Sequence, residues 1–219
     1  ADLAPVFVGG TTVTRATLHN LEELQRKDVR PGDTVIVHRA GDVIPEVIGP
    51  VLDKRPDGAL PVEAPTECPV CGTGLVKDEG LVALRCPNKA CPAQVENKLT
   101  HFASRTAMDI EGLGEKQVAR FVELGWLSDL PSLYRLASRR DELIGLDRMG
   151  ELSVKNLLEG IEASKTRPLA RAIYALGIPQ VGEKTAQDLA RVFGSLENLA
   201  GADLAALEAV PNIGATTAE

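Results

Sequence analysis

Four cysteines in two close pairs are the residues whose spacing most clearly indicates chemistry. Two residues separate Cys68 from Cys71, four separate Cys86 from Cys91, and fourteen separate the two pairs. Two pairs at the ends of a hairpin-length insert can present four thiolates to one point, as in a tetrahedral zinc site. Because protein ligands fill all four positions, the pattern predicts a structural zinc rather than a catalytic one.

A redox C-x-x-C motif and a disulfide pair are the alternatives for these cysteines. A redox centre would need one pair within a thioredoxin-like βαβ pattern, which the surrounding sequence does not show. Disulfides are rare in intracellular proteins. Apolar residues on both sides of the polar turn at residues 77–80 predict a two-stranded ribbon between the pairs. We expect zinc removal to unfold residues 68–95.

A second candidate site recurs four times in the second half of the chain. Residues 110–118, 146–154, 178–186 and 210–218, here copies one to four, align without gaps on a shared glycine. These glycines are Gly114, Gly150, Gly182 and Gly214. Their spacing of about 32 to 36 residues indicates one supersecondary unit used repeatedly. Each unit is predicted as helix, glycine turn and helix, whose first backbone N–H groups can hold an anion.

The four copies are not equivalent in their side chains. Glycine is expected in the turn because it permits positive φ and close approach of a phosphate. Lys116 and Lys184 follow the shared glycine in copies one and three, which are therefore predicted as the better phosphate binders. Copies two and four are predicted mainly as packing partners, although copy two keeps Lys155. The alternative is a helical solenoid whose glycines only terminate helices.

The elements around these sites predict a multidomain chain, β first and α after. Residues 1–62 are predicted as a partial OB-fold β-barrel, with strands near 5–8, 34–38 and 42–48 and a helix over 16–24. Residues 63–95 are predicted as a linker and a small four-cysteine zinc finger. Residues 96–219 are predicted as an all-α helix-hairpin-helix domain of four repeats, the last of them truncated.

Composition limits the partners and the chemistry. A net charge of −7 argues against nucleic-acid binding mainly through a basic field. It does not exclude backbone contacts to phosphate. An aromatic content of 3% argues against stacking surfaces for single strands. With no long apolar run and no signal-like start, the chain is expected to be a soluble, cytoplasmic monomer without membrane contact.

No catalytic centre is found in the sequence. His19, His38 and His101 are scattered without a partner spacing that makes a triad, and are predicted as solvated or packed. Residues 54–58 are similar to the K-x-D-G motif of nucleotidyltransferases, but they contain one residue too many and are predicted as a turn.

The order of these parts closely resembles bacterial NAD-dependent DNA ligase over essentially the whole chain. The resemblance rests on residues 10–20 and 39–45, on the cysteines followed by residues 92–94, and on four helix-hairpin-helix motifs. It implies an enzyme that seals 5′-phosphate/3′-hydroxyl nicks in DNA replication and repair, using NAD and magnesium. It places the AMP-accepting lysine upstream, so this chain alone is expected to bind nicked duplex DNA without sealing it.

The resemblance also implies roles for individual residues. It assigns the zinc to Cys68, Cys71, Cys86 and Cys91. In the OB segment it implies DNA contacts by Arg15, Thr17, Asn20, Arg39, Val43 and Ile44. In the hairpins it implies DNA contacts by Gly112, Gly114, Lys116, Gly150, Lys155, Gly182, Lys184 and Gly214. Two other hypotheses stay open from the residues alone: a stand-alone architectural or repair scaffold, and a zinc-ribbon adaptor that binds protein.

Overall fold

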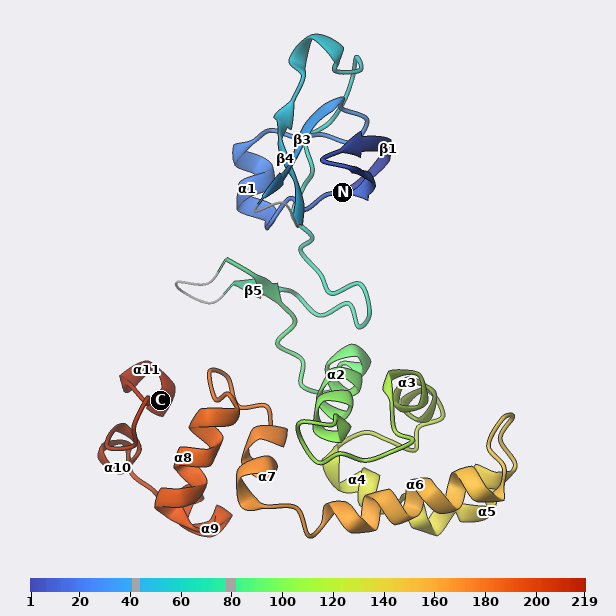
Figure 1. Cartoon of the computed structure of the whole chain (residues 1–219), viewed down its shortest axis with the longest axis vertical. Coiled ribbons are helices and arrows are strands. Elements are labelled where there is room, and N and C mark those ends of the chain that lie inside the picture. Colours follow the sequence, from blue (N-terminus) through green and yellow to red (C-terminus); the bar gives the residue numbers. More distant parts are fainter. Residues whose placement is uncertain (41–43, 78–81) are drawn as a thin grey trace. The chain divides into compact units, whose positions relative to one another are not determined.

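The computed structural model describes residues 1–40, 44–77 and 82–219, and it shows strands in the first part of the chain and helices in the second (Figure 1). The chain divides into two compact units, Ala1–Pro87 and Asn88–Glu219. This order of strands first and helices after confirms the predicted fold class. No helix in the described ranges is long and apolar enough to cross a membrane.

The first unit opens with an antiparallel hairpin. Strands β1 (Asp2–Val8) and β2 (Thr11–Arg15) pair with Val8 opposite Thr11. Gly9 and Gly10 form the two-residue turn, with φ of 55° and 84°. Two successive positive φ values match the right-handed twist of the flanking strands, and glycine reaches them without steric cost.

A second antiparallel pair follows in the first unit. It consists of β3 (Val35–Ala40) and β4 (Ile44–Pro50), with a register shift between Ile36 and Val37. Thr17 extends this pair as a parallel bridge to β4: its N–H donates to the carbonyl of Pro45 at 2.8 Å. Its carbonyl accepts from the Val47 N–H at 3.0 Å. The segment after β2 is therefore fastened alongside β4.

That bridge explains a wrong prediction. The helix expected over residues 16–24 begins only at Leu21, as α1 (Leu21–Arg26). Ladder bonds to β4 occupy the backbone of Thr17, so tertiary pairing overrides the local helical pattern there. Asn20 instead caps the helix, and its side chain accepts from the Glu23 N–H at 2.9 Å.

The core of the first unit is small and aliphatic. Ala16, Val29 and Val47 are buried together, with partly buried Leu and Val side chains packed on them. In the described parts of the chain, the strands form three two-stranded sheets and no closed barrel. The predicted OB-fold is thus present as a partial one.

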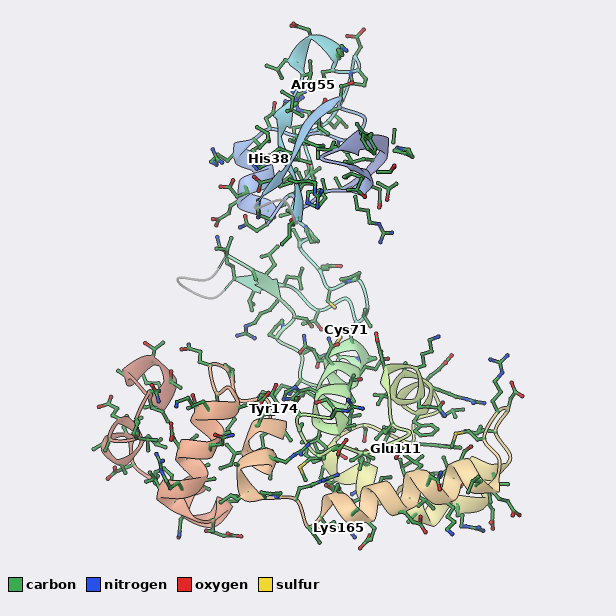
Figure 2. All side chains as sticks on the ribbon, in the orientation of Figure 1. His38, Arg55, Cys71, Glu111, Lys165 and Tyr174 are labelled. Atoms are coloured by element: carbon green, nitrogen blue, oxygen red, sulfur yellow. The ribbon has the colours of Figure 1, made fainter. Side chains whose placement is uncertain are left out.

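Beyond β4, an ion-pair cluster fastens the chain back onto the first unit. After the short 3₁₀ helix η1 (Leu52–Lys54), the Arg55 guanidinium lies 2.9 Å from the Asp33 carboxylate and 2.8 Å from that of Asp28 (Figure 2). Arg30 adds a third contact, to Asp28 at 2.9 Å. Residues 57 and 58 form the predicted turn, so the sequence similar to K-x-D-G is a structural connection.

This cluster predicts acid sensitivity of the first unit. Hydrogen bonds from Arg30 and Arg55 lower the pKa of Asp28 below 3.8, and those from Arg55 lower the pKa of Asp33. A lowered folded pKa contributes stability above the unfolded value, and that stability is lost as pH falls below about 4. We expect the melting temperature of the first unit, monitored through the amide signals of β3, to fall steeply in this acid range. Arg55→Gln should lower the melting temperature at neutral pH and make its fall in acid less steep. If the fall in acid were as steep as before, the ion-pair cluster would not be its cause.

The insert between the cysteine pairs forms the predicted two-stranded ribbon. Strands β5 (Val76–Lys77) and β6 (Leu84–Arg85) pair antiparallel, with Val76 opposite Arg85. The polar turn predicted at residues 77–80 lies outside the described residues from position 78 onward. The ribbon places the two cysteine pairs at the same end of the insert.

The second unit is helical throughout. Its helices are α2 (Pro92–Ala103), α3 (Glu115–Glu123), α4 (Leu130–Tyr134), η2 (Leu136–Arg139), α5 (Arg140–Ile144), α6 (Glu151–Ser164), α7 (Leu169–Ala175), α8 (Glu183–Phe193), α9 (Leu196–Ala200), α10 (Leu204–Glu208) and α11 (Ala215–Ala218). The predicted boundary between residues 95 and 96 falls inside α2. Four helix pairs, α2/α3, α5/α6, α7/α8 and α10/α11, flank the four glycine turns.

The four hairpins pack as two pairs. Copies one and two bury their apolar residues in one cluster, which includes Leu113, Val118 and Val154. Copies three and four share a separate cluster, which includes Val181 and Ile213. In every copy the residue before the shared glycine is buried, and this apolar anchor fixes the turn against the core.

Helix α7 links the two pairs within the second unit. The His101 ring nitrogen lies 2.9 Å from the Tyr174 carbonyl, and the two rings meet edge to face. Arg167 donates to the Asp109 carboxylate at 2.8 Å, next to the copy-one turn. His101 is thus a packed histidine, which is one of the two states predicted for it.

The prediction that the shared glycines have positive φ is wrong. Gly114, Gly150 and Gly182 have φ of −81°, −82° and −80°, and each ends the turn in extended backbone as the residue before a helix. Positive φ occurs two residues earlier, at the apex of each turn. The apex residues are Gly112 (82°), Arg148 (63°), Gln180 (64°) and Asn212 (67°). Backbone conformation therefore does not explain the shared glycine.

Candidate metal centre and nucleic-acid interface

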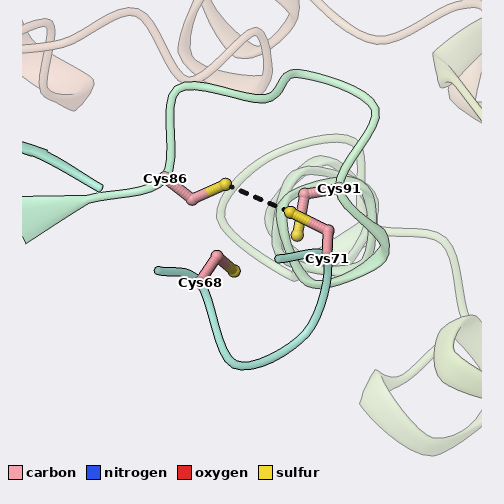
Figure 3. Close-up of side chains that lie close together, drawn as sticks. All are labelled: Cys68, Cys71, Cys86 and Cys91. Carbon is pink, nitrogen blue, oxygen red and sulfur yellow. Dashed lines mark hydrogen bonds between the residues drawn. The ribbon is translucent and has the colours of Figure 1, made fainter. Parts of the chain in front are cut away.

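The four cysteine sulfurs converge on one point, as Figure 3 shows. Cys68 and Cys71 lie on one tight turn, in which the Gly72 N–H donates to the Cys68 carbonyl at 2.9 Å and Gly72 has φ of 69°. A second turn shapes the other pair: the Cys91 N–H donates to the Asn88 carbonyl at 3.0 Å. Local backbone geometry thus aims both pairs at the same place.

The cluster fits a tetrahedral metal ion. All four sulfurs lie within 4.8 Å of one another, and those of Cys71 and Cys86 are 3.5 Å apart. Zinc–sulfur bonds of about 2.3 Å in a tetrahedron place sulfurs about 3.8 Å apart. A disulfide would need about 2.05 Å. Cys91 also directly precedes α2, whose N-terminus favours the negative charge of a metal-bound thiolate.

The hairpin turns present unsatisfied backbone donors. Helices α3, α6 and α8 each follow a shared glycine, and none has a side-chain cap. In the described part of the chain, the N–H groups of Gly114, Glu115 and Lys116 have no acceptor. The same holds at the corresponding positions of the other copies. Helix N-termini with open N–H groups and a positive dipole end bind anions such as phosphate.

Nothing in the part of the chain that the structure describes requires glycine at these positions. A Cβ built at Gly114, Gly150, Gly182 or Gly214 would meet no atom of these described residues within 4 Å. Since φ is also ordinary there, neither packing nor conformation excludes a side chain. What the glycine leaves open is space directly over the donor groups.

The predicted lysines differ in their surroundings. Lys116 and Lys184 are exposed beside the open N–H groups of copies one and three, and no carboxylate in the described residues forms an ion pair with either. Lys155 of copy two is exposed but lies 3.8 Å from Glu159 on its own helix. That copies one and three bind phosphate better than copies two and four stays a prediction.

The predicted OB residues gather around Pro45. Arg39 lies opposite Pro45 in the β3–β4 pair, Thr17 bonds to the Pro45 carbonyl, and Ile44 precedes it with its side chain exposed. Val43 lies outside the described residues. Arg39 also donates to the Gly9 carbonyl at 2.7 Å. The structure therefore brings residues from β3, β4 and the segment after β2 into one area of the first unit.

Arg15 and Asn20 are placed differently. Arg15 ends β2, is exposed and lies 2.9 Å from the Asp2 carboxylate. Asn20 uses its side-chain oxygen as the cap of α1. Its amide nitrogen is the group that remains for an outside partner.

Sequence reasoning missed one polar cluster next to these residues. Two of the histidines predicted as scattered share one carboxylate: His19 lies 2.6 Å from one Glu46 oxygen and His38 lies 3.2 Å from the other (Figure 2). His19 has φ of 62°, so the contact holds the turn between Thr17 and Asn20 in a left-handed conformation. No sequence signal joins His19 to a residue 27 positions away.

Comparison with known protein families matches three parts of the chain: the first strands, the cysteine segment and the later hairpins. Residues 1–59 match the NAD-dependent DNA ligase OB-fold domain, and residues 67–93 match the NAD-dependent DNA ligase C4 zinc finger domain. Residues 171–219 match the helix-hairpin-helix motif. Together they define a multidomain protein of the DNA-binding class, and the zinc finger match with the cysteine cluster supports the predicted structural zinc.

The chain is also similar to longer curated proteins. It is 53% identical to a DNA ligase of Symbiobacterium thermophilum and 54% identical to one of Psychrobacter sp.. These alignments cover 100% and 99% of this chain, and 32% of each relative. The chain is therefore similar over its whole length to part of these DNA ligases, and it spans about a third of the length of the relatives it matches.

Proposed function

We propose that this chain is the portion of an NAD-dependent DNA ligase that holds nicked duplex DNA while the nick is sealed. The observation that carries the proposal is that ligase OB-fold and zinc finger segments occur in one chain with hairpins that present open N–H groups. Phosphate contacts of this kind position a duplex without reading its sequence, which suits an enzyme acting at any nick.

In this proposal each part has its own role. The hairpins bind phosphates through the amides beside the shared glycines, with Lys116 and Lys184 supplying charge. The OB residues around Pro45, with Val43, Arg15 and Asn20, meet the duplex near the nick. Zinc bound by Cys68, Cys71, Cys86 and Cys91 keeps the finger folded and takes no part in the reaction.

The chemistry itself is assigned to another part of the longer protein. There NAD would supply the AMP group for a lysine, with release of nicotinamide mononucleotide. The AMP would activate the 5′-phosphate and leave as the 3′-hydroxyl attacks, with assistance from magnesium. Within this sequence the nearest match to the nucleotidyltransferase motif, residues 54–58, lies in the turn held by Arg55. We place the protein in the cytoplasm, acting in DNA replication and repair as a monomer.

Binding without sealing is the test of this function. We expect fluorescence anisotropy to show binding of this chain to a nicked duplex, with weaker binding to the same duplex without a nick. Because few cationic side chains take part, the affinity should fall less steeply with salt than for a basic protein making as many phosphate contacts. No ligated product should form when NAD and magnesium are added.

Three results would count against the proposal. Failure to bind any duplex, with capture of a protein partner instead, would favour the adaptor hypothesis. Sealing by this chain alone would place the reactive lysine within it and refute the division of labour. Equal affinity for nicked and intact duplex would favour an architectural protein.

A further inference from the structure

In each pair of hairpins, a residue in the second helix of one copy is hydrogen-bonded to the turn of the other copy, and this contact is called the brace below. In the first pair, Arg120 of α3 donates to the Asp147 carbonyl in the copy-two turn at 2.9 Å. In the second pair, the Asn212 amide of the copy-four turn donates to the Asp188 carboxylate of α8 at 3.2 Å. Arg120 and Asp188 each lie six residues after the shared glycine of their own copy, so the helix ends of the two braces correspond, while their turn ends, Asp147 and Asn212, differ by one position in the repeat.

Asp188 is an unusual residue for that position. It is 7% exposed at the edge of the second core, and its other oxygen accepts from Arg191 at 2.6 Å. Buried carboxylates are tolerated where charge and hydrogen bonds compensate them. Its second partner, Asn212, is the apex residue of the copy-four turn, with φ of 67°. The buried charge thus holds a left-handed turn in place.

A contact in the opposite direction connects copy four to copy three. Thr217 of α11 lies with its hydroxyl 3.1 Å from the side-chain oxygen of Gln180, the apex residue of the copy-three turn. That turn ends at Gly182 and carries the open N–H groups in front of α8. The Asp188–Asn212 contact fixes copy four, and copy four in turn supports the phosphate-facing turn of copy three.

We propose that Asp188 is a positioning residue for duplex binding. It acts through Asn212 and copy four on the backbone donors of Gly182, Glu183 and Lys184. This rests on the proposed function, because the donors it positions are those assigned to phosphate. Copy four contributes to affinity by keeping copy three in shape.

An exchange of the two partners tests this directly. Asn212→Asp places a second carboxylate against Asp188, while aspartate still tolerates the left-handed turn. In a fluorescence anisotropy titration with nicked duplex, this variant should bind about tenfold more weakly, which is typical of a broken coupled pair. Adding Asp188→Asn restores a carboxylate–amide pair in reverse, and should return the affinity to within about twofold of the original.

A matched control separates the effect of the Asp188–Asn212 contact on affinity from the effect of net charge. Asn212→Asp with Asp203→Asn carries the same total charge as the exchanged pair but keeps the two facing carboxylates. Asparagine caps α10 as well as aspartate does, so helix α10 should be preserved. This control should remain about tenfold weaker. Amide signals of residues 182–184, recorded without DNA, should shift in N212D and return in N212D/D188N.

The outcomes are distinguishable. If the original chain binds duplex and N212D binds equally well, the positioning role is overturned while the proposed function stands. If the Asp203→Asn control recovers affinity as fully as the exchange, charge alone acts and the role is again overturned. If the original chain binds no duplex, both are overturned. Circular dichroism at the titration temperature confirms that all variants are folded.

Discussion

Removing zinc is expected to unfold residues 68–91 and leave the helices of the second unit intact. In its described residues, 68–77 and 82–91, the segment has two short strands, and its buried side chains are those of Cys68 and Cys91. A structural zinc supplies about 10 to 16 kcal/mol of apparent binding energy in finger peptides at neutral pH, which such a segment cannot replace by packing. Elemental analysis should find one zinc per chain.

Limited proteolysis shows where the structure is lost. After chelation, or in Cys86→Ser, new cleavage should appear within residues 68–91, while far-ultraviolet circular dichroism keeps most of its helical signal. Asn88→Ala is the matched control: it removes the side-chain contact to the Ala90 N–H but leaves four thiols, so zinc should be retained. Absence of zinc together with an unchanged cleavage pattern would contradict a metal centre.

Alanine at the shared glycines of copies one and three is expected to separate stability from binding. In Gly114→Ala and Gly182→Ala the new methyl group meets no atom of the described residues, and φ near −80° suits alanine. The unfolded chain loses freedom, which stabilises the fold by about 0.4 to 1 kcal/mol, but alanine is a poorer N-cap than glycine by a similar amount, so stability should change little. The same methyl group lies over the donors and hinders phosphate. We therefore expect affinity to fall about tenfold per site, and about a hundredfold for both.

Melting and binding measured on the same preparations check this prediction. Gly145→Ala serves as the control, because Gly145 has φ of −72° in the copy-two hairpin but does not precede a helix N-terminus. It should melt no lower than the original chain and bind DNA equally well. Melting of the double variant far below that of the Gly145→Ala control would show that the glycines serve the fold. Unchanged affinity would remove the hairpin amides from the interface.

Features encoded by neighbouring residues were predicted from the sequence. The cysteine spacing predicted a convergent cluster because each pair needs only one tight turn. Helices α3, α6 and α8 begin directly after the shared glycines, as the predicted helix, glycine turn and helix require. Glu115, Glu151 and Glu183 favour these starts because acidic residues stabilise a helix N-terminus. The ribbon between the cysteine pairs followed from two apolar runs around a polar turn.

Features set by distant contacts were not predicted. The start of α1 was wrong because Thr17 pairs with β4, and the cluster of His19 and His38 on Glu46 depends on the same pairing. The left-handed position in the hairpins was misassigned because glycine recurs at a different place. Gly112 marks the apex of copy one, but the other three apex residues have side chains, so no recurring glycine marked this position in the sequence.

Those apex residues have a consequence for how the hairpins can be changed. Arginine, glutamine and asparagine at positive φ each cost about 1 kcal/mol of backbone strain, which the buried anchor beside them outweighs. In copy two the apex residue Arg148 is almost fully exposed, so its side chain is free to vary while the buried anchor and the following helix keep the course of the backbone. This hairpin therefore offers a position at which surface chemistry can be redesigned independently of shape, whereas the apex side chains Gln180 and Asn212 take part in the contacts between copies three and four.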